Sequence, residues 1–313
     1  MRVVFMGSPD FAVPCLRALA EKHDVALVVS QPDKPAGRGG QMHAPAVKTA
    51  ALELGLPVIQ PRSAKTGELR DALVATNAEL AVVVAYGKIL PLPVLTALPR
   101  GCINVHGSIL PRYRGAAPIQ WAVINGDAET GVAIMQLDEG MDTGPVFLEK
   151  RTAIGPEETS GELFARLSPL GASTLLEAID GIAAGTLHAT AQDHALATHA
   201  PMLDKTDGAI DFAQPVHRVA ARIRGVDPWP GAQVQHRGQV LKLFRAVAGA
   251  GRGAPGTIIA IDAVGVHVAT ADGAVVIREV QAAGKKRMTA QQFAQGRGIA
   301  VGDVLTKPVV QPA

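Results

Sequence analysis

Short apolar runs alternate with amphipathic segments through the first 140 residues, and this alternation restricts the fold more than any other feature. Runs typical of buried strands lie at 2–6, 24–30, 57–61, 79–87, 102–108 and 131–140. Helix-like segments separate them at 10–19, 46–54, 67–77 and 116–126, and another follows at 160–184. Strands that alternate with helices favour βαβ units and a mostly parallel sheet. The sequence therefore predicts an α/β, doubly wound first domain.

The pattern changes after the last of these helices. Residues 190–207 are polar and rich in turn-forming residues, which is typical of a linker. Beyond them lie short strand-like runs, with the hairpin signal TADG at 270–273. Such strands favour a small OB-like β-barrel, a fold that often binds nucleic acid. We therefore expect a catalytic domain over 1–189, a linker over 190–207 and a smaller OB-like domain over 208–313.

Charge is distributed unevenly between these parts. Residues 206–313 carry 13 Lys and Arg against 7 Asp and Glu, whereas residues 1–205 carry 17 against 21. A basic segment on an acidic body suggests a polyanionic partner for the second domain, although a solvated surface with a chance bias explains the counts equally well. The densest basic cluster is Lys285, Lys286 and Arg287.

Several common sites and segments are missing from the sequence. The stretch FMGSPDF after the first strand lacks the G-x-G-x-x-G glycines, and no phosphate-binding G-x-x-x-x-G-K-[ST] motif occurs. The two cysteines, Cys15 and Cys102, offer neither metal spacing nor a disulfide framework. No segment has the length and apolar character of a signal peptide or a membrane span. We expect a soluble, cytoplasmic chain without a metal.

Polar side chains gather just past two of the predicted strands. Asn104 and His106 are two residues apart, so in an extended segment they lie on the same face. Asp142 follows the next strand in the glycine-bounded stretch DEGMDTG. A carboxylate beside an imidazole favours its protonated form, and a protonated His with an Asn amide gives two donors for an oxyanion. The alternative is a strand-end histidine with satisfied hydrogen bonds and an aspartate that caps a loop.

Six stretches of the chain resemble the methionyl-tRNA formyltransferase family, in the order in which that family has them. They are MGSPDFAVPCL, QPDKPAGRG, INVHGSILPRYRGAAPIQWAVINGD, DEGMDTGPV, DPWPGA and QAAGKKRM. The likeness extends over nearly the whole chain. It implies transfer of the formyl group of 10-formyltetrahydrofolate to the free α-amino group of methionyl-initiator tRNA, which yields N-formylmethionyl-tRNA for translation initiation.

The resemblance also implies roles for individual residues. It makes Asn104, His106 and Asp142 the catalytic set of a formyltransferase-like domain, and it places folate contacts along Ser108, Ile109, Leu110 and Pro111. It implies that the OB-like domain holds the tRNA and that Arg38 lies on a loop that contacts it. Together with the basic cluster, these expectations make Arg38, Lys285, Lys286 and Arg287 the tRNA-binding residues.

Two departures from the family pattern concern tRNA binding. Relatives often have a pair of lysines after the loop arginine, where this chain has Gly40 and Gln41, and often a linker lysine at the position of Met202. Three other functions remain open: a formyltransferase for amino-sugar nucleotides, a formyltetrahydrofolate hydrolase and a nucleic-acid-binding protein without catalysis. We expect a monomer.

Overall fold

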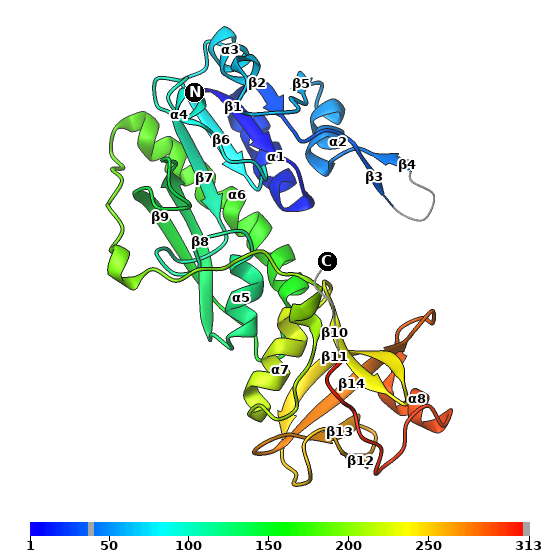
Figure 1. The fold of residues 1–313 in the computed structure, drawn as a ribbon. Coiled ribbons are helices and arrows are strands. Elements are labelled where there is room, and N and C mark those ends of the chain that lie inside the picture. Colours follow the sequence, from blue (N-terminus) through cyan, green and yellow to red (C-terminus); the bar gives the residue numbers. More distant parts are fainter. Residues whose placement is uncertain (37–40, 309–313) are drawn as a thin grey trace. The chain divides into compact units, whose positions relative to one another are not determined.

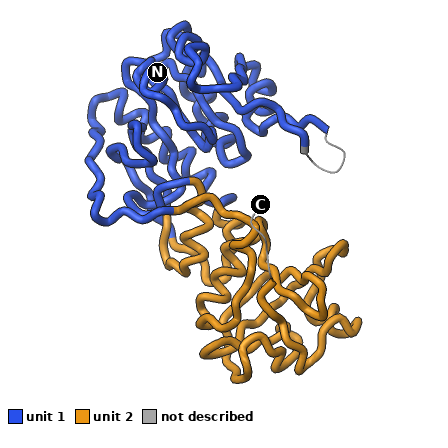
Figure 2. Tube along the Cα trace, viewed as in Figure 1, with its two compact units in different colours: residues 1–115, 131–152, 164–199 blue, residues 116–130, 153–163, 200–313 orange. Residues whose placement is uncertain are grey.

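The computed structural model describes residues 1–36 and 41–308, which form two compact units (Figures 1 and 2). Unit 1 comprises residues 1–115, 131–152 and 164–199. Unit 2 comprises residues 116–130, 153–163 and 200–313. Both units are therefore assembled from separate stretches of the chain, and the chain passes between them more than once.

A seven-stranded sheet organises unit 1, in the order β5-β2-β1-β6-β7-β8-β9. The pairs from β5 to β7 are parallel, and β8 runs antiparallel to β7. This arrangement confirms the mostly parallel sheet. The strands are β1 (Arg2–Gly7), β2 (Asp24–Val29), β5 (Val58–Ile59), β6 (Leu80–Val84), β7 (Cys102–His106), β8 (Glu129–Gln136) and β9 (Val146–Ala153).

The central strands are buried because helices pack against the sheet (Figure 1). All five residues of β6 are buried, as expected for a parallel strand covered on both faces. The helices are α1 (Val13–Lys22), α2 (Ala46–Glu53), α3 (Gly67–Ala75), α4 (Leu92–Leu95) and α6 (Ser160–Ala184), with short 3₁₀ turns at Asp10–Ala12 and His194–Leu196. A further 3₁₀ turn, Lys205–Gly208, belongs to unit 2. Parallel strands from β5 to β7 end at the same edge of the sheet, which is where ligands bind in such folds.

The Gly- and Pro-rich stretch after β2 is not simply a loop. It contains a short antiparallel pair, β3 (Lys34–Ala36) and β4 (Gln41–His43). All three residues of β4 are exposed. The segment therefore lacks the alternation of buried and exposed positions from which a strand can be predicted. Arg38 and Gly40 lie outside the described residues.

Unit 2 contains a second, antiparallel sheet, in the order β10-β11-β14-β13-β12 with β15 beside β14. Its first and last strands are joined by residues 303–306, since Gln235 in β10 pairs with Thr306 and Thr257 before β12 pairs with Val304. The sheet is therefore closed into a small barrel. The strands are β10 (Ala232–His236), β11 (Gln239–Gly249), β12 (Ile258–Ile261), β13 (Val266–Ala269), β14 (Ala274–Ala282) and β15 (Met288–Thr289).

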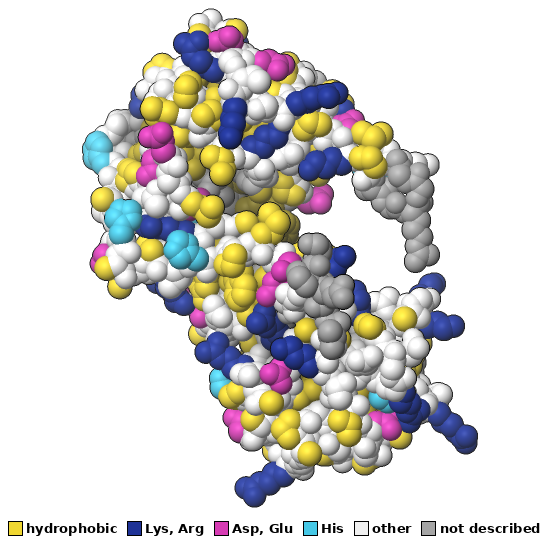
Figure 3. All heavy atoms as spheres, in the orientation of Figure 1, with side chains coloured by type: hydrophobic (Ala, Val, Ile, Leu, Met, Phe, Trp, Pro, Cys, Tyr) yellow, Lys and Arg dark blue, Asp and Glu magenta, His cyan; other side chains and the backbone are white. Residues whose placement is uncertain are grey.

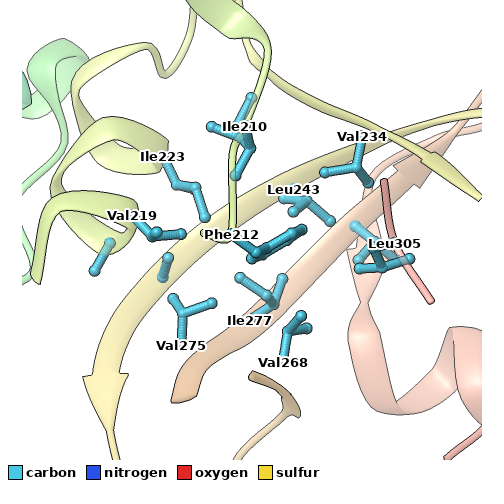
Figure 4. Close-up of a cluster of buried hydrophobic side chains, with 14 of the residues drawn as sticks. Ile210, Phe212, Val219, Ile223, Val234, Leu243, Val268, Val275, Ile277 and Leu305 are labelled. Carbon is cyan, nitrogen blue, oxygen red and sulfur yellow. The ribbon is translucent and has the colours of Figure 1, made fainter. Parts of the chain in front are cut away.

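Apolar side chains from helices and strands fill this barrel (Figure 4). Phe212 lies among Ile277, Leu243 and Leu305, all of which are at most 4% exposed. The helices of the unit are α5 (Pro118–Ile124), α7 (Val216–Gly225) and α8 (Ala290–Gln295). The TADG turn connects β13 to β14, as predicted. The expected second domain of short antiparallel strands is thus confirmed.

Candidate active site

The first two candidate catalytic residues lie on β7. This strand lies in the middle of the sheet, between β6 and β8, and it ends at His106 at the carboxyl edge of the parallel strands. Asn104 is half-buried, and His106 is 5% exposed. Their spacing places both residues on one face of the sheet, as the sequence predicted.

The imidazole of His106 contacts one acceptor through each ring nitrogen. Nε2 donates a hydrogen bond of 2.9 Å to the Tyr113 carbonyl oxygen. A carbonyl oxygen only accepts, so Nε2 carries a proton. Nδ1 lies 3.7 Å from Oδ2 of Asp142, which is within ion-pair distance but longer than a direct hydrogen bond. Nδ1 is therefore the ring nitrogen that can form a hydrogen bond with a substrate atom.

The third candidate, Asp142, is held in position by backbone geometry. Its φ of +53° lies in the left-handed region, where a short polar residue such as Asp is tolerated better than most side chains. Its Oδ2 accepts a 2.8 Å hydrogen bond from the Gly115 amide, and its side chain is 16% exposed. The structure therefore brings His106 and Asp142 together, and it makes the Tyr113 carbonyl the group that orients the imidazole.

Gln192 is a part of the site that the sequence did not reveal. Its Nε2 donates to the carbonyl oxygens of Asp142 at 2.9 Å and Gly144 at 2.7 Å. Its Oε1 accepts from Nε and Nη2 of Arg114 at 3.1 and 2.7 Å. Gln192 thus ties the Asp142 loop to the segment that follows β7. It stands 50 residues away in a turn-rich passage, and a single glutamine there gives no sequence signal.

Arg114 is a buried cation whose hydrogen bonds go to neutral groups. It is 5% exposed, and besides Gln192 its Nη2 lies 3.1 Å from Nδ1 of His194. Among the described residues it has no carboxylate partner. Burial of a guanidinium without a carboxylate partner costs free energy. The two hydrogen bonds that Gln192 Oε1 accepts from Arg114 therefore stabilise this region.

The candidate folate residues form a turn whose side chains point largely inward. Ser108 is fully buried, and its hydroxyl donates to the Arg112 carbonyl oxygen at 2.6 Å. Leu110 packs with Ala133 and Met135 on β8. Ile109 is only partly buried. A ligand beside this turn would therefore meet backbone groups and the Ile109 side chain rather than the Ser108 hydroxyl.

One buried hydroxyl near the same sheet edge has no hydrogen-bond partner among the described residues. It belongs to Tyr86, which lies two residues beyond β6 and is 1% exposed. Burial raises the pKa of this phenol, so it stays a donor. An unpaired buried donor fits a ligand with hydrogen-bonding edges, such as a folate ring. The described residues contain no group of three or more His, Cys, Asp or Glu that could hold a metal ion.

The candidate tRNA-binding residues differ in their surroundings. Lys285 and Lys286 are exposed between β14 and β15. Arg287 instead forms ion pairs with Glu279 and with Asp227, the latter at 3.4 Å, and its guanidinium carbon lies 4.0 Å from the centre of the Phe244 ring. Arg38 lies outside the described residues. Gln41 and Met202, which replace lysines of the family pattern, are both exposed.

None of the helices in the described ranges 1–36 and 41–308 combines the length and apolar character that a membrane span requires.

Comparison with known proteins identifies relatives along the whole chain. Residues 1–179 match the formyl transferase family, and residues 202–298 match the formyl transferase C-terminal domain. A methionyl-tRNA formyltransferase of Desulfotalea psychrophila is 50% identical over 308 residues, which cover 97% of this chain and 95% of the relative.

Solved structures show the same fold at much lower identity. A sugar 3N-formyl transferase, WlaRD, studied with dTDP and 5-N-formyl-tetrahydrofolate, is 16% identical with a TM-score of 0.69, over 91% of this chain and 99% of that one. HypX from Aquifex aeolicus, in complex with tetrahydrofolic acid, is 18% identical with a TM-score of 0.64, over 96% of this chain and 48% of that one.

Proposed function

Because the chain belongs to the methionyl-tRNA formyltransferase family, we propose that Asn104, His106 and Asp142 form its catalytic centre. The enzyme transfers the formyl group of 10-formyltetrahydrofolate to the amino group of methionyl-initiator tRNA, for use in translation initiation. The observation that carries the residue assignment is the approach of His106 Nδ1 to the Asp142 carboxylate at 3.7 Å, at the carboxyl end of β7.

The nucleophile is the α-amino group of the esterified methionine. A free α-amino group titrates at about 7.7–8.0, so a large fraction is neutral near pH 7.5 and needs no strong base. Its nitrogen attacks the formyl carbon, and the carbonyl oxygen becomes an oxyanion. Transfer is complete when the bond from this carbon to the folate nitrogen breaks and the nitrogen gains a proton. The protein must therefore stabilise an oxyanion and move one proton.

In this proposal, Asn104 and His106 stabilise the oxyanion. The Asn104 amide and the Nδ1 proton of His106 donate to the same oxygen, from neighbouring positions on one strand face. His106 is suited to this because Nε2 is bound to the Tyr113 carbonyl, which fixes the ring, while Nδ1 makes no direct hydrogen bond within the described residues. Oriented donors that need no rearrangement are among the strongest contributors to such catalysis.

Asp142 has two tasks in the proposed mechanism. Its carboxylate lies within ion-pair distance of His106 Nδ1 and faces this nitrogen while it donates to the oxyanion. Its carboxylate also accepts the proton that the attacking amine loses and passes it, through water, to the departing folate nitrogen. The Gly115 amide and the Gln192 side chain support it by holding the carboxylate and the loop.

The donor substrate is placed along Ser108, Ile109, Leu110 and Pro111 and beside Tyr86. We propose that backbone groups of this turn meet the edges of the folate ring and that the Ile109 side chain packs against its face. The buried Tyr86 hydroxyl has no hydrogen-bond partner among the described residues, which supports the placement of a polar edge of the folate ring beside it. The folate itself supplies the activated one-carbon unit.

The tRNA partner is assigned to the second part of the chain. We propose a catalytic domain over 1–189, a linker over 190–207 and a tRNA-binding OB-like domain over 208–313, with Arg38, Lys285, Lys286 and Arg287 on the tRNA. The family matches at 1–179 and 202–298 support the division. We also propose that the enzyme acts in the cytoplasm, as a monomer.

One assay tests the proposed function against its rivals. Radiolabelled formyl transfer from 10-formyltetrahydrofolate is measured with charged initiator tRNA, with a UDP-amino sugar and without an acceptor. We expect label on the tRNA alone. Label on the sugar, or formate released without an acceptor, would assign the chain to a different reaction.

A further inference from the structure

A cavity of about 460 Å³ lies within unit 2, outside the site described above. Trp121 on α5 lines it together with Arg218 and Arg222 on α7 and Lys307 after the barrel. Asp211 is the acidic side chain in its lining. In Figure 3, Lys and Arg side chains gather on the face of this unit over its helical part. The volume is within the range of about 300–1,000 Å³ that is usual for small-ligand pockets.

The cations of this cavity are only partly neutralised. Arg222 pairs with Asp207 at 3.4 Å. Arg218 reaches only the Asn125 carbonyl oxygen, at 3.4 Å, and neither Arg218 nor Lys307 forms an ion pair with any described residue. Unpaired like charges in one concave site repel each other and concentrate anions. The cavity is therefore complementary to a negatively charged group such as a phosphate.

Trp121 adds an aromatic surface in a fixed orientation. Its indole packs against the barrel core, and its Nε1 donates a 2.8 Å hydrogen bond to the Pro201 carbonyl oxygen. The Arg222 guanidinium carbon lies 5.6 Å from the centre of the ring. A positively charged groove with an anchored aromatic ring is the combination by which proteins bind unpaired nucleotides: cations hold the phosphate, and the base stacks on the ring.

We propose that this cavity holds one unpaired nucleotide of the tRNA substrate, with its phosphate on Arg218 and Lys307 and its base against Trp121. A nucleotide within a stem cannot occupy it, because its base is stacked inside the duplex. The inference rests on the proposed function, and it places part of the tRNA contact on α5 and α7 rather than on the Lys285–Arg287 cluster.

Kinetics with charged tRNA test the phosphate contacts. In the Arg218→Gln/Lys307→Gln variant we expect a several-fold higher KM for methionyl-tRNA, with kcat and the KM for folate unchanged. The slope of log(kcat/KM) against log salt should fall by about 1 for each phosphate contact removed. The matched control is Arg252→Gln, an exposed arginine outside the cavity. Equal effects in variant and control would overturn the proposal.

Fluorescence tests the base contact without disturbing the cavity. The chain has two tryptophans, so in Trp229→Phe the emission comes from Trp121 alone. We expect added tRNA to quench this emission, and we expect Trp121→Leu to raise the KM for methionyl-tRNA roughly tenfold or more. Unchanged emission on a tRNA that demonstrably binds would refute the stacking.

These outcomes are separable from the proposed function. If the wild-type enzyme does not formylate methionyl-tRNA, the proposed function fails. If it does, and the cavity variants bind and react like wild type, only the cavity assignment fails.

Discussion

At the scale of single residues, the site depends on which ring nitrogen of His106 is free. The Tyr113 carbonyl oxygen accepts the hydrogen bond from Nε2, so Nδ1 is the ring nitrogen that faces Asp142. The sequence predicted a carboxylate, Asp142, beside the imidazole. Nothing in it predicted the role of Tyr113, because any backbone carbonyl can accept a hydrogen bond and the identity of the residue carries no signal.

Asn104 is the simplest test of the oxyanion assignment. We expect Asn104→Ala to lower kcat by roughly 10²–10³ with little change in either KM, since the amide acts on charge that develops in the transition state. Asn104→Asp keeps the size but replaces the donor with an acceptor, and it should be at least as impaired. Near-normal turnover in the alanine variant would remove Asn104 from the mechanism.

Gln192 allows positioning to be separated from stability. Gln192→Glu keeps an acceptor for Arg114 but loses the donor to the Asp142 and Gly144 carbonyls, so we expect kcat to fall roughly 10- to 100-fold with stability nearly retained. Gln192→Leu also leaves the buried Arg114 without that acceptor. It should lose about 1.5–3 kcal/mol of unfolding free energy in addition. Urea unfolding and steady-state kinetics measure both quantities, and a fully active Glu variant contradicts the positioning role.

At the scale of helices and strands, much of the fold could be predicted from the sequence. Buried strands such as β6 and β7 were predicted because parallel strands carry continuous apolar runs. β9 was missed because its residues are half-buried or exposed and show no alternation. The reversal of β8 against β7 was also missed, since strand direction depends on packing and not on local pattern. The same limit hid Gln192, which reaches the site only through the path of the chain.

Gly131 on β8 is required by the close approach of its neighbours. A Cβ there would lie 2.2 Å from the Lys150 carbonyl oxygen and 2.4 Å from Cδ1 of Ile109. We expect Gly131→Ala to cost about 1–3 kcal/mol of stability and to raise the KM for folate, because the 108–111 turn must shift. Gly67→Ala, where the nearest atom is at 3.7 Å, is the matched control. Equal KM values for folate in both variants would contradict a role of the 108–111 turn in folate binding.

The buried thiols of α1 and β7 predict a loss of stability at alkaline pH. Burial raises the pKa of both Cys15 and Cys102 to about 12. An unfolded thiol loses its proton near pH 8.5, so above that pH the unfolded state binds fewer protons and stability falls as pH rises toward 12. We expect a loss of about 1.4 kcal/mol per thiol by pH 9.5. Urea unfolding of wild type against Cys15→Ala/Cys102→Ala measures it, and identical pH slopes would contradict it.

At the scale of the whole molecule, the two units differ in the chemistry that we propose for them. The three proposed catalytic side chains belong to unit 1, whereas the basic cluster and the cavity lined by Trp121 and Arg218 belong to unit 2. The excess of positive charge in residues 206–313 fits a polyanion that is bound by one part of the chain and modified by the other.

The exposed lysines between β14 and β15 test this division of labour. We expect Lys285→Gln/Lys286→Gln to raise the KM for methionyl-tRNA and to flatten its dependence on salt, with kcat unchanged. Arg287 is unsuitable for such a test, because its ion pairs and its contact with Phe244 make it part of the packing of the unit. An unaltered salt dependence would shift the tRNA contact to another surface.

The pairing of residues 303–306 with β10 and β12 has a consequence for biosynthesis. As the ribosome makes the chain, all the named strands of the barrel emerge before residues 303–306. The sheet therefore keeps two unpaired edges until this segment leaves the exit tunnel. Nonsense or frameshift lesions upstream of Asp303 would yield a product with strands left open to pairing between molecules. Such truncated chains would be expected in inclusion bodies and among protease substrates, even with Asn104, His106 and Asp142 intact.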